Sequence, residues 1–306
     1  MRFLPNEDQA TFLSVLEQMT ESPEAKWKTS PEWARFDWSA EFDAMLEANG
    51  FLECAAEESL GLVTAAAMTY RLATLPIAVE CAASAMLRPL YFPDLPRPIA
   101  VLEGGGRRAV PFLPVAKSVV AISEAGVRTA TLSDNAIEPI ESLFAYPMGV
   151  LETTELDWRP VEADPAAVRD TWRIAVAAEI AGVLRGGLDS VVAHVKDRQQ
   201  FGRPLGSFQA IQQRLASAAT KVEAAYWLTL KAAQGLAAPD AAIALGYVQE
   251  ASTRIVYDLH QFMGAMGLTL EHPLHRWTYR ARLLRSTLGG ASANMKAVSE
   301  RRWRAA

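Results

Sequence analysis

The sequence has little cysteine and little excess charge, and each shortage excludes a class of protein. Its 306 residues include two cysteines, Cys54 and Cys81, too few for a disulfide framework and without the spacing of a metal site. Thirty Lys and Arg against 35 Asp and Glu give a net charge of −5, so the chain has no general attraction for polyanions. We expect two reduced, buried thiols and no nucleic-acid partner.

Long apolar runs are also missing. No window approaches the roughly 20 apolar residues that a membrane-spanning helix needs. Residues 1–8 include acidic Glu7 and Asp8 and lack the apolar core of a secretory signal. The four histidines show no metal-ligand spacing with acids or cysteines. These absences predict a cytoplasmic protein with no membrane span and no metal centre.

Apolar residues fill half of the sequence, which is enough for a large core and two or three domains. In the first third they recur at helical spacing. Residues 6–19 begin with Asn6, a capping residue, and residues 31–48 repeat the pattern. Residues 59–87 are rich in Ala, Leu and Met and must break or kink at Pro76. We expect an N-terminal helical domain at residues 1–90.

The pattern changes between residues 91 and 162. Short apolar stretches separated by turn residues are typical of strands, and they cover residues 99–102, 109–113, 118–122 and 127–132. The three glycines at residues 104–106 suggest a phosphate-binding loop, but the Gly-Lys-Ser/Thr ending is missing and no helix pattern follows. A flexible hairpin turn is the better interpretation. We predict a small β-domain at residues 91–162.

Residues 163–306 contain four helical patterns. Pro239 and Pro273 suit helix starts, and apolar residues spaced three and four apart are typical of helices packed nearly antiparallel. The patterns cover residues 164–197, 208–225, 239–266 and those after 273, the last interrupted at residues 289–290. Short connections predict an antiparallel four-helix bundle. The predicted fold class is therefore mainly α with a small β-domain.

Two turns of the bundle carry recognisable motifs. Residues 198–209 have the sequence Arg-Gln-Gln-Phe-Gly-Arg-Pro-Leu-Gly-Ser-Phe-Gln, and residues 261–267 have the sequence Gln-Phe-Met-Gly-Ala-Met-Gly. Together they resemble the motifs by which acyl-CoA dehydrogenases reach the FAD of a neighbouring subunit. The resemblance covers the chain well from Asp164 onward, weakly in the N-terminal third and hardly in the middle.

The resemblance implies FAD as the cofactor and assigns contacts to it. The implied contacts are Arg198, Gln200, Phe201, Leu205, Gln209, Gln261, Gly264 and Ala265. The forked guanidinium donors of Arg198 match pyrophosphate oxygens better than a lysine would. Ala265 replaces the family's second glycine and adds a methyl group where the backbone approaches the cofactor. If the resemblance is set aside, the sequence of residues 198–209 predicts a solvated loop between helices.

The family's catalytic and flavin-clasping residues are missing. Its Thr-Glu-x-x-x-Gly-Ser-Asp and Trp-x-Thr/Ser strings are absent from the middle segment. The two usual positions of the catalytic carboxylate correspond to Leu288 and Trp172, and neither side chain can accept a proton. Two weak candidates remain. Glu179 lies near the edge of a helical apolar face, where a hydrogen-bonded or interface carboxylate is the alternative, and Glu271 precedes a helix, where acids commonly act as caps.

The FAD-contact motifs are retained, whereas the flavin-clasping strings and the catalytic carboxylate are missing. This combination predicts a subunit that completes an FAD site for α,β-dehydrogenation of an acyl-CoA and supplies no base. Such subunits form α2β2 tetramers with a second acyl-CoA dehydrogenase chain, and some act on steroid side chains or other bulky acids. An electron-transfer flavoprotein is the implied acceptor. One alternative is an active homo-oligomer whose base is Glu179 or Glu271. The other is a flavin-free helical scaffold.

Overall fold

The computed structural model describes residues 4–21, 36, 38–104, 107–133, 136–151, 156–236 and 238–303. The helices are α1 (Glu7–Glu21), α2 (Ala40–Ala48), α3 (Gly61–Ala73), α4 (Arg88–Tyr91), α5 (Pro165–Asp197), α6 (Gln209–Gly235), α7 (Ala238–Met263), α8 (Leu274–Leu284) and α9 (Gly290–Trp303). The strands are β1 (Ile99–Glu103), β2 (Ala109–Pro111), β3 (Ser118–Ser123), β4 (Gly126–Thr131), β5 (Ile137–Ile140), β6 (Met148–Leu151), β7 (Arg159–Pro160), β8 (Gln199–Gln200) and β9 (Arg203–Pro204).

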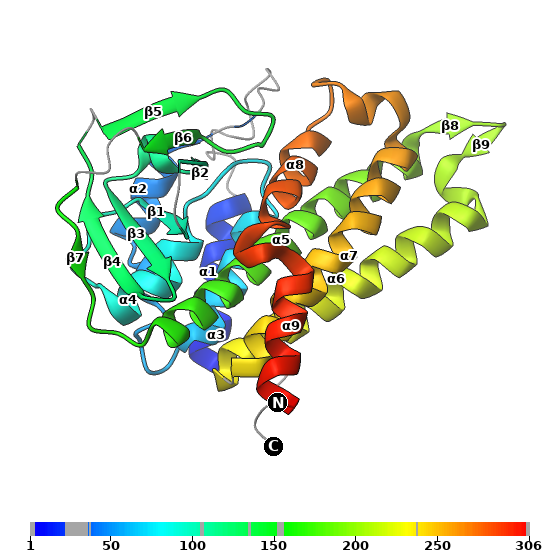
Figure 1. Ribbon diagram of the computed structural model, residues 1–306. Helices are drawn as coiled ribbons and strands as arrows, with labels where there is room; N and C mark the ends of the chain where they lie inside the picture. The colour runs from blue at the N-terminus through cyan, green and yellow to red at the C-terminus, as the bar shows by residue number, and fades with distance from the viewer. Residues whose placement is uncertain are drawn as a thin grey trace.

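The predicted fold class is confirmed. Figure 1 shows the strands of the small β region on one side and the long helices α5, α6 and α7 on the other, with α5 running between the two parts. The hairpin β8–β9 projects from the far end of the long helices. The domain boundaries at residues 90 and 162 stay a prediction.

The N-terminal helices follow the capping rules that the sequence suggested. The Asn6 side chain accepts a hydrogen bond from the Gln9 amide at 2.8 Å, and Gln9 Oε1 accepts one from the Asn6 amide at 3.0 Å, a reciprocal capping box. Of the helix expected at residues 31–48, residues 31–35 and 37 lie outside the described residues. The described part, α2, begins after Ser39, whose hydroxyl accepts from the Phe42 amide.

Two expectations for the rest of this third are confirmed. Helix α3 ends at Ala73, three residues before Pro76, because a proline inside a helix removes a backbone donor and clashes with the preceding turn. Cys54 and Cys81 are both buried and free. Burial raises the pKa of the Cys54 thiol to about 12, so this thiol is unreactive.

The β region consists of two small sheets. One has the strand order β1-β3-β4-β7 and the other the order β2-β6-β5. β1 pairs with β3 in parallel, and β2 pairs with β6 in antiparallel. The hairpin expected around residues 104–106 is therefore wrong, because the strands that flank it belong to different sheets; residues 105 and 106 lie outside the described residues. β5, β6 and β7 were not expected from the sequence.

Helix α5 is the centre of the core, since it packs against α3, α6, α7 and α8. Its approach to α3 depends on glycine. A Cβ atom at Gly182 would lie 2.2 Å from the Tyr70 carbonyl oxygen, and one at Gly186 would lie 2.5 Å from the Thr74 oxygen. Side chains at either position would push the helices apart. The two glycines thus allow α3 and α5 to pack in close contact.

Helix α8 completes the end of α3. Buried Arg280 donates to the carbonyl oxygens of Ala73 at 3.1 Å, Leu75 at 2.6 Å and Ile77 at 2.9 Å. Trp277 Nε1 donates to the Thr74 oxygen at 2.9 Å. Helix ends leave such carbonyls without partners, and a cation there also suits the helix dipole.

The C-terminal helices match the predicted bundle with adjusted ends. α7 ends at Met263 and continues as the short 3-10 helix η7 (Gly264–Leu268). The last pattern is divided into α8 and α9 by η8 (Thr287–Gly289). Among the described residues, no helix is long and apolar enough to cross a membrane, and no three His, Cys, Asp or Glu residues gather as a metal site would require.

Candidate functional site

The two motif turns lie together at one end of the bundle, where they form a groove of about 490 Å³. We call it the hairpin groove. It is lined by His194, Arg198, Gln200, Leu205, Ile211, Arg214, Gln261, Phe262, Met263, Gly264, Ala265 and Met266. Six of the predicted cofactor contacts belong to this lining. The remaining two, Phe201 and Gln209, do not line it.

Phe201 stands at the tip of the hairpin. Phe201 and Gly202 have φ angles of 55° and 78°, as a two-residue turn of type I′ requires at both central positions. Asn, Asp and Gly favour such turns, whereas an aromatic residue with positive φ is unusual and strained. The Phe201 side chain is nonetheless 86% exposed. The ring lies 6.1 Å from the Phe208 ring in an edge-to-face arrangement, and the rest of it faces outward.

Two arginines give the hairpin groove its charge. The backbone of Arg198 is hydrogen-bonded to His194 and Leu205, but its guanidinium has no salt bridge with any described residue. Arg214 lies 4.6 Å over the Phe262 ring and contacts the Asp258 carboxylate. Its Nε is buried and has no hydrogen-bond partner among the described residues. Burial and nearby Arg198 lower the pKa of His194.

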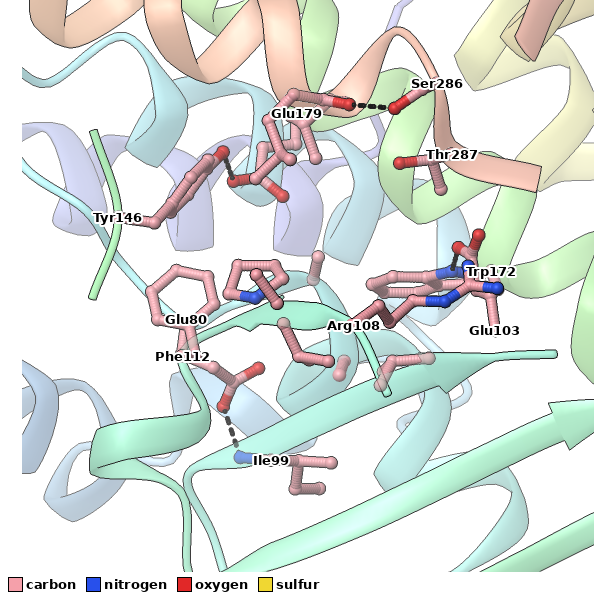
Figure 2. Close-up of a pocket in the computed structure, with 18 residues that line it drawn as sticks. Glu80, Ile99, Glu103, Arg108, Phe112, Tyr146, Trp172, Glu179, Ser286 and Thr287 are labelled. Atoms are coloured by element: carbon pink, nitrogen blue, oxygen red, sulfur yellow. Dashed lines mark hydrogen bonds between the residues drawn. The ribbon is translucent and has the colours of Figure 1, made fainter. Parts of the chain in front are cut away.

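A second hollow, the inner cavity, lies between the β region and the bundle. Its volume is about 160 Å³. Figure 2 shows Tyr146 and Glu179 at one side, Trp172, Glu103 and Arg108 at another, and Glu80 below. Its lining comes from β1, β2, α5 and α8, from the residues that follow α8, and from Glu80, Ala82, Ala83, Phe112 and Tyr146.

Glu103, at the end of β1, accepts hydrogen bonds from two other parts of the chain. Trp172 Nε1 donates to Glu103 Oε1 at 2.6 Å, and the Leu288 amide donates to Oε2 at 2.7 Å. Burial raises the pKa of Glu103, while the hydrogen bonds and the charge of Arg108 act in the opposite direction. The two positions that the sequence compared with the family's base thus contact the same carboxylate.

Comparison with known proteins identifies the bundle. Residues 170–303 match the family described as "Acyl-CoA dehydrogenase, C-terminal domain". Over these residues the chain resembles the C-terminal domain of acyl-CoA dehydrogenases. The curated relatives agree: the acyl-CoA dehydrogenase FadE34 of Mycobacterium tuberculosis is 32% identical over 171 residues. That match covers 53% of this chain and 24% of FadE34, so the chain spans about a quarter of that relative.

Solved structures extend the likeness to the whole fold. A chain of the ChsE4-ChsE5 complex from Mycobacterium tuberculosis has a TM-score of 0.75 and 22% identity, covering 97% of this chain and 98% of that one. The "Tcur3481-Tcur3483 steroid ACAD G363A variant" has a TM-score of 0.73 and 22% identity, covering 96% and 97%. The predicted resemblance to acyl-CoA dehydrogenases is confirmed.

The two weak candidates for the base of an acyl-CoA dehydrogenase lie in different surroundings. Glu179 is 5% exposed and lines the inner cavity, so it lies inside the core and not at the edge of a helical face. Tyr146 Oη donates to it at 2.6 Å. Burial raises the pKa of Glu179, and Arg280 partly offsets this. Glu271 is exposed in the turn before α8 and lines neither hollow.

Sequence reasoning missed three polar residues of the inner cavity: Glu80, Glu103 and Tyr146. Glu80 accepts from the Ile99 amide at 3.1 Å and lies 3.7 Å from Arg97, and burial raises its pKa. Glu103 and Tyr146 come from the middle segment, which has the weakest family resemblance, and Glu80 comes from the weakly matching N-terminal third. One signal was present for Glu103, since it is an acidic residue that directly ends an apolar strand.

Proposed function

We propose that this chain is the subunit of a hetero-oligomeric acyl-CoA dehydrogenase that completes an FAD site across a subunit interface and supplies no catalytic base. The observation that carries the proposal is the hairpin groove. It brings both family motifs together at one end of the bundle and leaves part of its polar lining without partners among the described residues.

The groove residues fit the diphosphate region of FAD. The guanidinium of Arg198, which has no salt bridge in the described part of the chain, and the buried Nε of Arg214, which has no hydrogen-bond partner there, are donors suited to phosphate oxygens. Gly264 has a φ of 65° and no atom within 4 Å of the position its Cβ would take, so a ligand can approach its backbone. Arg198, Gln261 and Gly264 would hold the diphosphate and adenosine half, while Phe201 would pack on the partner's side. The chemistry that bound FAD supplies is acceptance of the hydride from the acyl β-carbon.

The small volume of the inner cavity supports the inference that this chain does not form a complete acyl-CoA site of its own. Its volume of about 160 Å³ is below the roughly 300–1,000 Å³ of pockets that hold drug-sized ligands. By counting along the sequence, Trp172 and Leu288 correspond to the two positions where the family places the base, and the Glu103 carboxylate accepts hydrogen bonds from their N–H groups. We infer that the acyl-CoA, including that of a bulky acid such as a steroid side chain, binds in the partner subunit.

The likeness to the ChsE4-ChsE5 complex and to the Tcur3481-Tcur3483 steroid enzyme supports a paired assembly, because each of those names joins two gene products. This chain covers nearly the full length of one chain from each. An electron-transfer flavoprotein as acceptor and a cytoplasmic location stay predictions.

One observation favours a second candidate function, an active homo-oligomer that uses Glu179 as its base. Glu179 is a buried carboxylate with a raised pKa beside a cavity, as a general base for α-proton removal requires. Exposed Glu271 has no comparable support.

Flavin content separates these functions. The chain is purified alone under gentle conditions and again after co-expression with a second acyl-CoA dehydrogenase subunit, and the FAD-to-chain ratio is taken from the visible spectrum. We expect a nearly colourless chain alone and about one FAD per pair of unlike chains. A stoichiometric yellow protein that acyl-CoA bleaches without any partner would establish the homo-oligomer. Absence of flavin in every pairing would support the scaffold alternative.

A further inference from the structure

Three parts of the molecule that are distant in sequence meet on the Glu103 carboxylate. Glu103 ends β1, Trp172 belongs to the third turn of α5, and Leu288 lies in η8 between α8 and α9. Each carboxylate oxygen accepts one N–H donor, at 2.6 Å and 2.7 Å. We call Glu103, Trp172 and residues 288–290 the carboxylate clasp.

Trp172 forms part of the wall of the inner cavity. Its ring lines the cavity, and Figure 2 shows it beside Glu103 and Arg108. It packs against both the main helical core and the separate apolar cluster beneath β1, β3 and β4. An indole ring can turn about two side-chain bonds, so the hydrogen bond to Glu103 fixes which of its orientations is populated.

The backbone at residues 288–290 is strained toward the same carboxylate. Leu288, Gly289 and Gly290 have φ angles of 53°, 80° and 74°, and the first is a side-chain-bearing residue in a left-handed conformation. Such a conformation is unfavourable for a residue with a side chain and persists where its surroundings hold it. Here the amide of Leu288 donates to Glu103. The left-handed conformation of Leu288 therefore accompanies the hydrogen bond from its amide N–H to the buried Glu103 carboxylate.

We propose that Glu103 is a positioning residue that holds Trp172 across the inner cavity and so prevents this chain from binding an acyl thioester of its own. The inference deepens the proposed function and rests on it for its biological meaning, since it limits each pair of unlike chains to one acyl site. Its physical content, a cavity closed by the clasp, concerns this chain alone.

The first test is gain of binding. Replacing Trp172 by Ala enlarges a cavity whose other walls include Ile99, Val101 and Leu284, and enlarged apolar cavities take up small apolar ligands. Butyryl-CoA is titrated calorimetrically into the full chain, free of flavin. We expect no saturable binding to the wild type and 1:1 binding to Trp172→Ala, at least tenfold tighter than to the wild type.

The second test isolates Glu103. Glu103→Gln keeps the shape of the side chain but can accept from only one of the two donors through its remaining oxygen. We expect at least a threefold gain in butyryl-CoA affinity. On a Trp172→Phe background, which lacks the indole N–H, the same change should add nothing, because coupled residues are non-additive. A merely structural role of Glu103 would lower stability equally on both backgrounds and leave the affinity unchanged.

A matched control exists on α6. Trp227 Nε1 donates to Glu223 at 2.7 Å, the same indole-carboxylate pair outside the inner cavity, so Trp227→Ala should give no binding. The proposal is overturned if the wild type binds butyryl-CoA as tightly as the variants, or if folded Trp172→Ala and Glu103→Gln show no gain. If Trp172→Ala does not fold, the Glu103→Gln and Trp172→Phe cycle decides. Flavin content of the paired complex is measured separately, so failure of the hairpin groove is distinguishable from failure of the clasp.

Discussion

The inner cavity and the hairpin groove are both polar hollows, but they differ in how their polar groups are satisfied. In the cavity, Glu103 accepts from Trp172 and Leu288, and Glu179 accepts from Tyr146. In the groove, the Nε of Arg214 is buried without a partner among the described residues. Because buried polar groups in folded proteins are nearly always paired, the unpaired donor of the groove supports the proposal that a ligand binds there, whereas these cavity carboxylates already have partners among the described residues.

The same contrast holds for the backbone. Leu288 and Phe201 both have positive φ angles, 53° and 55°. The amide of Leu288 is used inside the molecule, whereas the ring of Phe201 is 86% exposed. Strain of this kind concentrates at functional sites. The comparison indicates that one strained turn closes a site and the other presents a surface.

The largest effect is expected from a substitution where α3 packs against α5. Gly182→Val should destabilise the chain by about 4 kcal/mol or more, because a Cβ there would lie 2.2 Å from the Tyr70 oxygen and overpacking forces backbone shifts. Urea unfolding followed by circular dichroism measures this. Gly235→Ala, which has no atom within 4 Å of the added Cβ, should change stability by less than about 1 kcal/mol. Equal effects of the two substitutions would contradict the packing argument.

The groove side is tested through Arg198. Loss of one charge-assisted hydrogen bond costs about 1.5–3 kcal/mol, so Arg198→Ala should weaken FAD binding by the paired complex about 10- to 100-fold. The thermal midpoint of the apoprotein should not move. Arg185→Ala serves as the control, since Arg185 pairs with Asp189 on the same helix outside the groove. Unchanged flavin stoichiometry in Arg198→Ala would remove this residue from the site.

The cavity side is tested through pH. Burial raises the pKa of Glu179, so the folded chain binds this proton more tightly than the unfolded chain does. The contribution of this proton to stability is fully present below the ordinary glutamate pKa and is lost as pH rises through the raised value. Glu179→Gln cannot ionise and still accepts from Tyr146, so the fall of stability with rising pH should become shallower. Urea midpoints across a pH series measure it, and parallel curves would refute the assignment. Turnover of a paired complex should remain nearly intact.

The smallest effect is expected at Glu271. This residue is exposed and lines neither hollow, and surface substitutions of this kind stay within about 0.5 kcal/mol. Glu271→Gln should therefore leave unfolding, flavin content and turnover of the paired complex unchanged. A loss of turnover by several orders of magnitude would instead make it the catalytic base.

The parts that sequence reasoning located are those with local signals. Helix α5 was expected from periodicity between Asp164 and Asp197, and the candidate cofactor contacts were expected from the family resemblance of two motifs that follow helix ends. β5 and β6 were missed because they contain Pro139 and Gly149, which strands usually disfavour. The clasp was missed because its hydrogen bonds join residues 69 and 185 positions apart, a separation that no local pattern encodes.

The capping of α3 by α8 has a consequence for the order in which the chain is made. The carbonyls of Ala73 and Ile77 receive their donors from Arg280, 207 and 203 residues later. While the ribosome synthesises the residues that precede α8, that end of α3 lacks these donors. Contacts this distant in sequence form late and slowly. A nascent chain stopped before α8 is therefore an unfinished fold, exposed to chaperones and proteases until its last helices emerge.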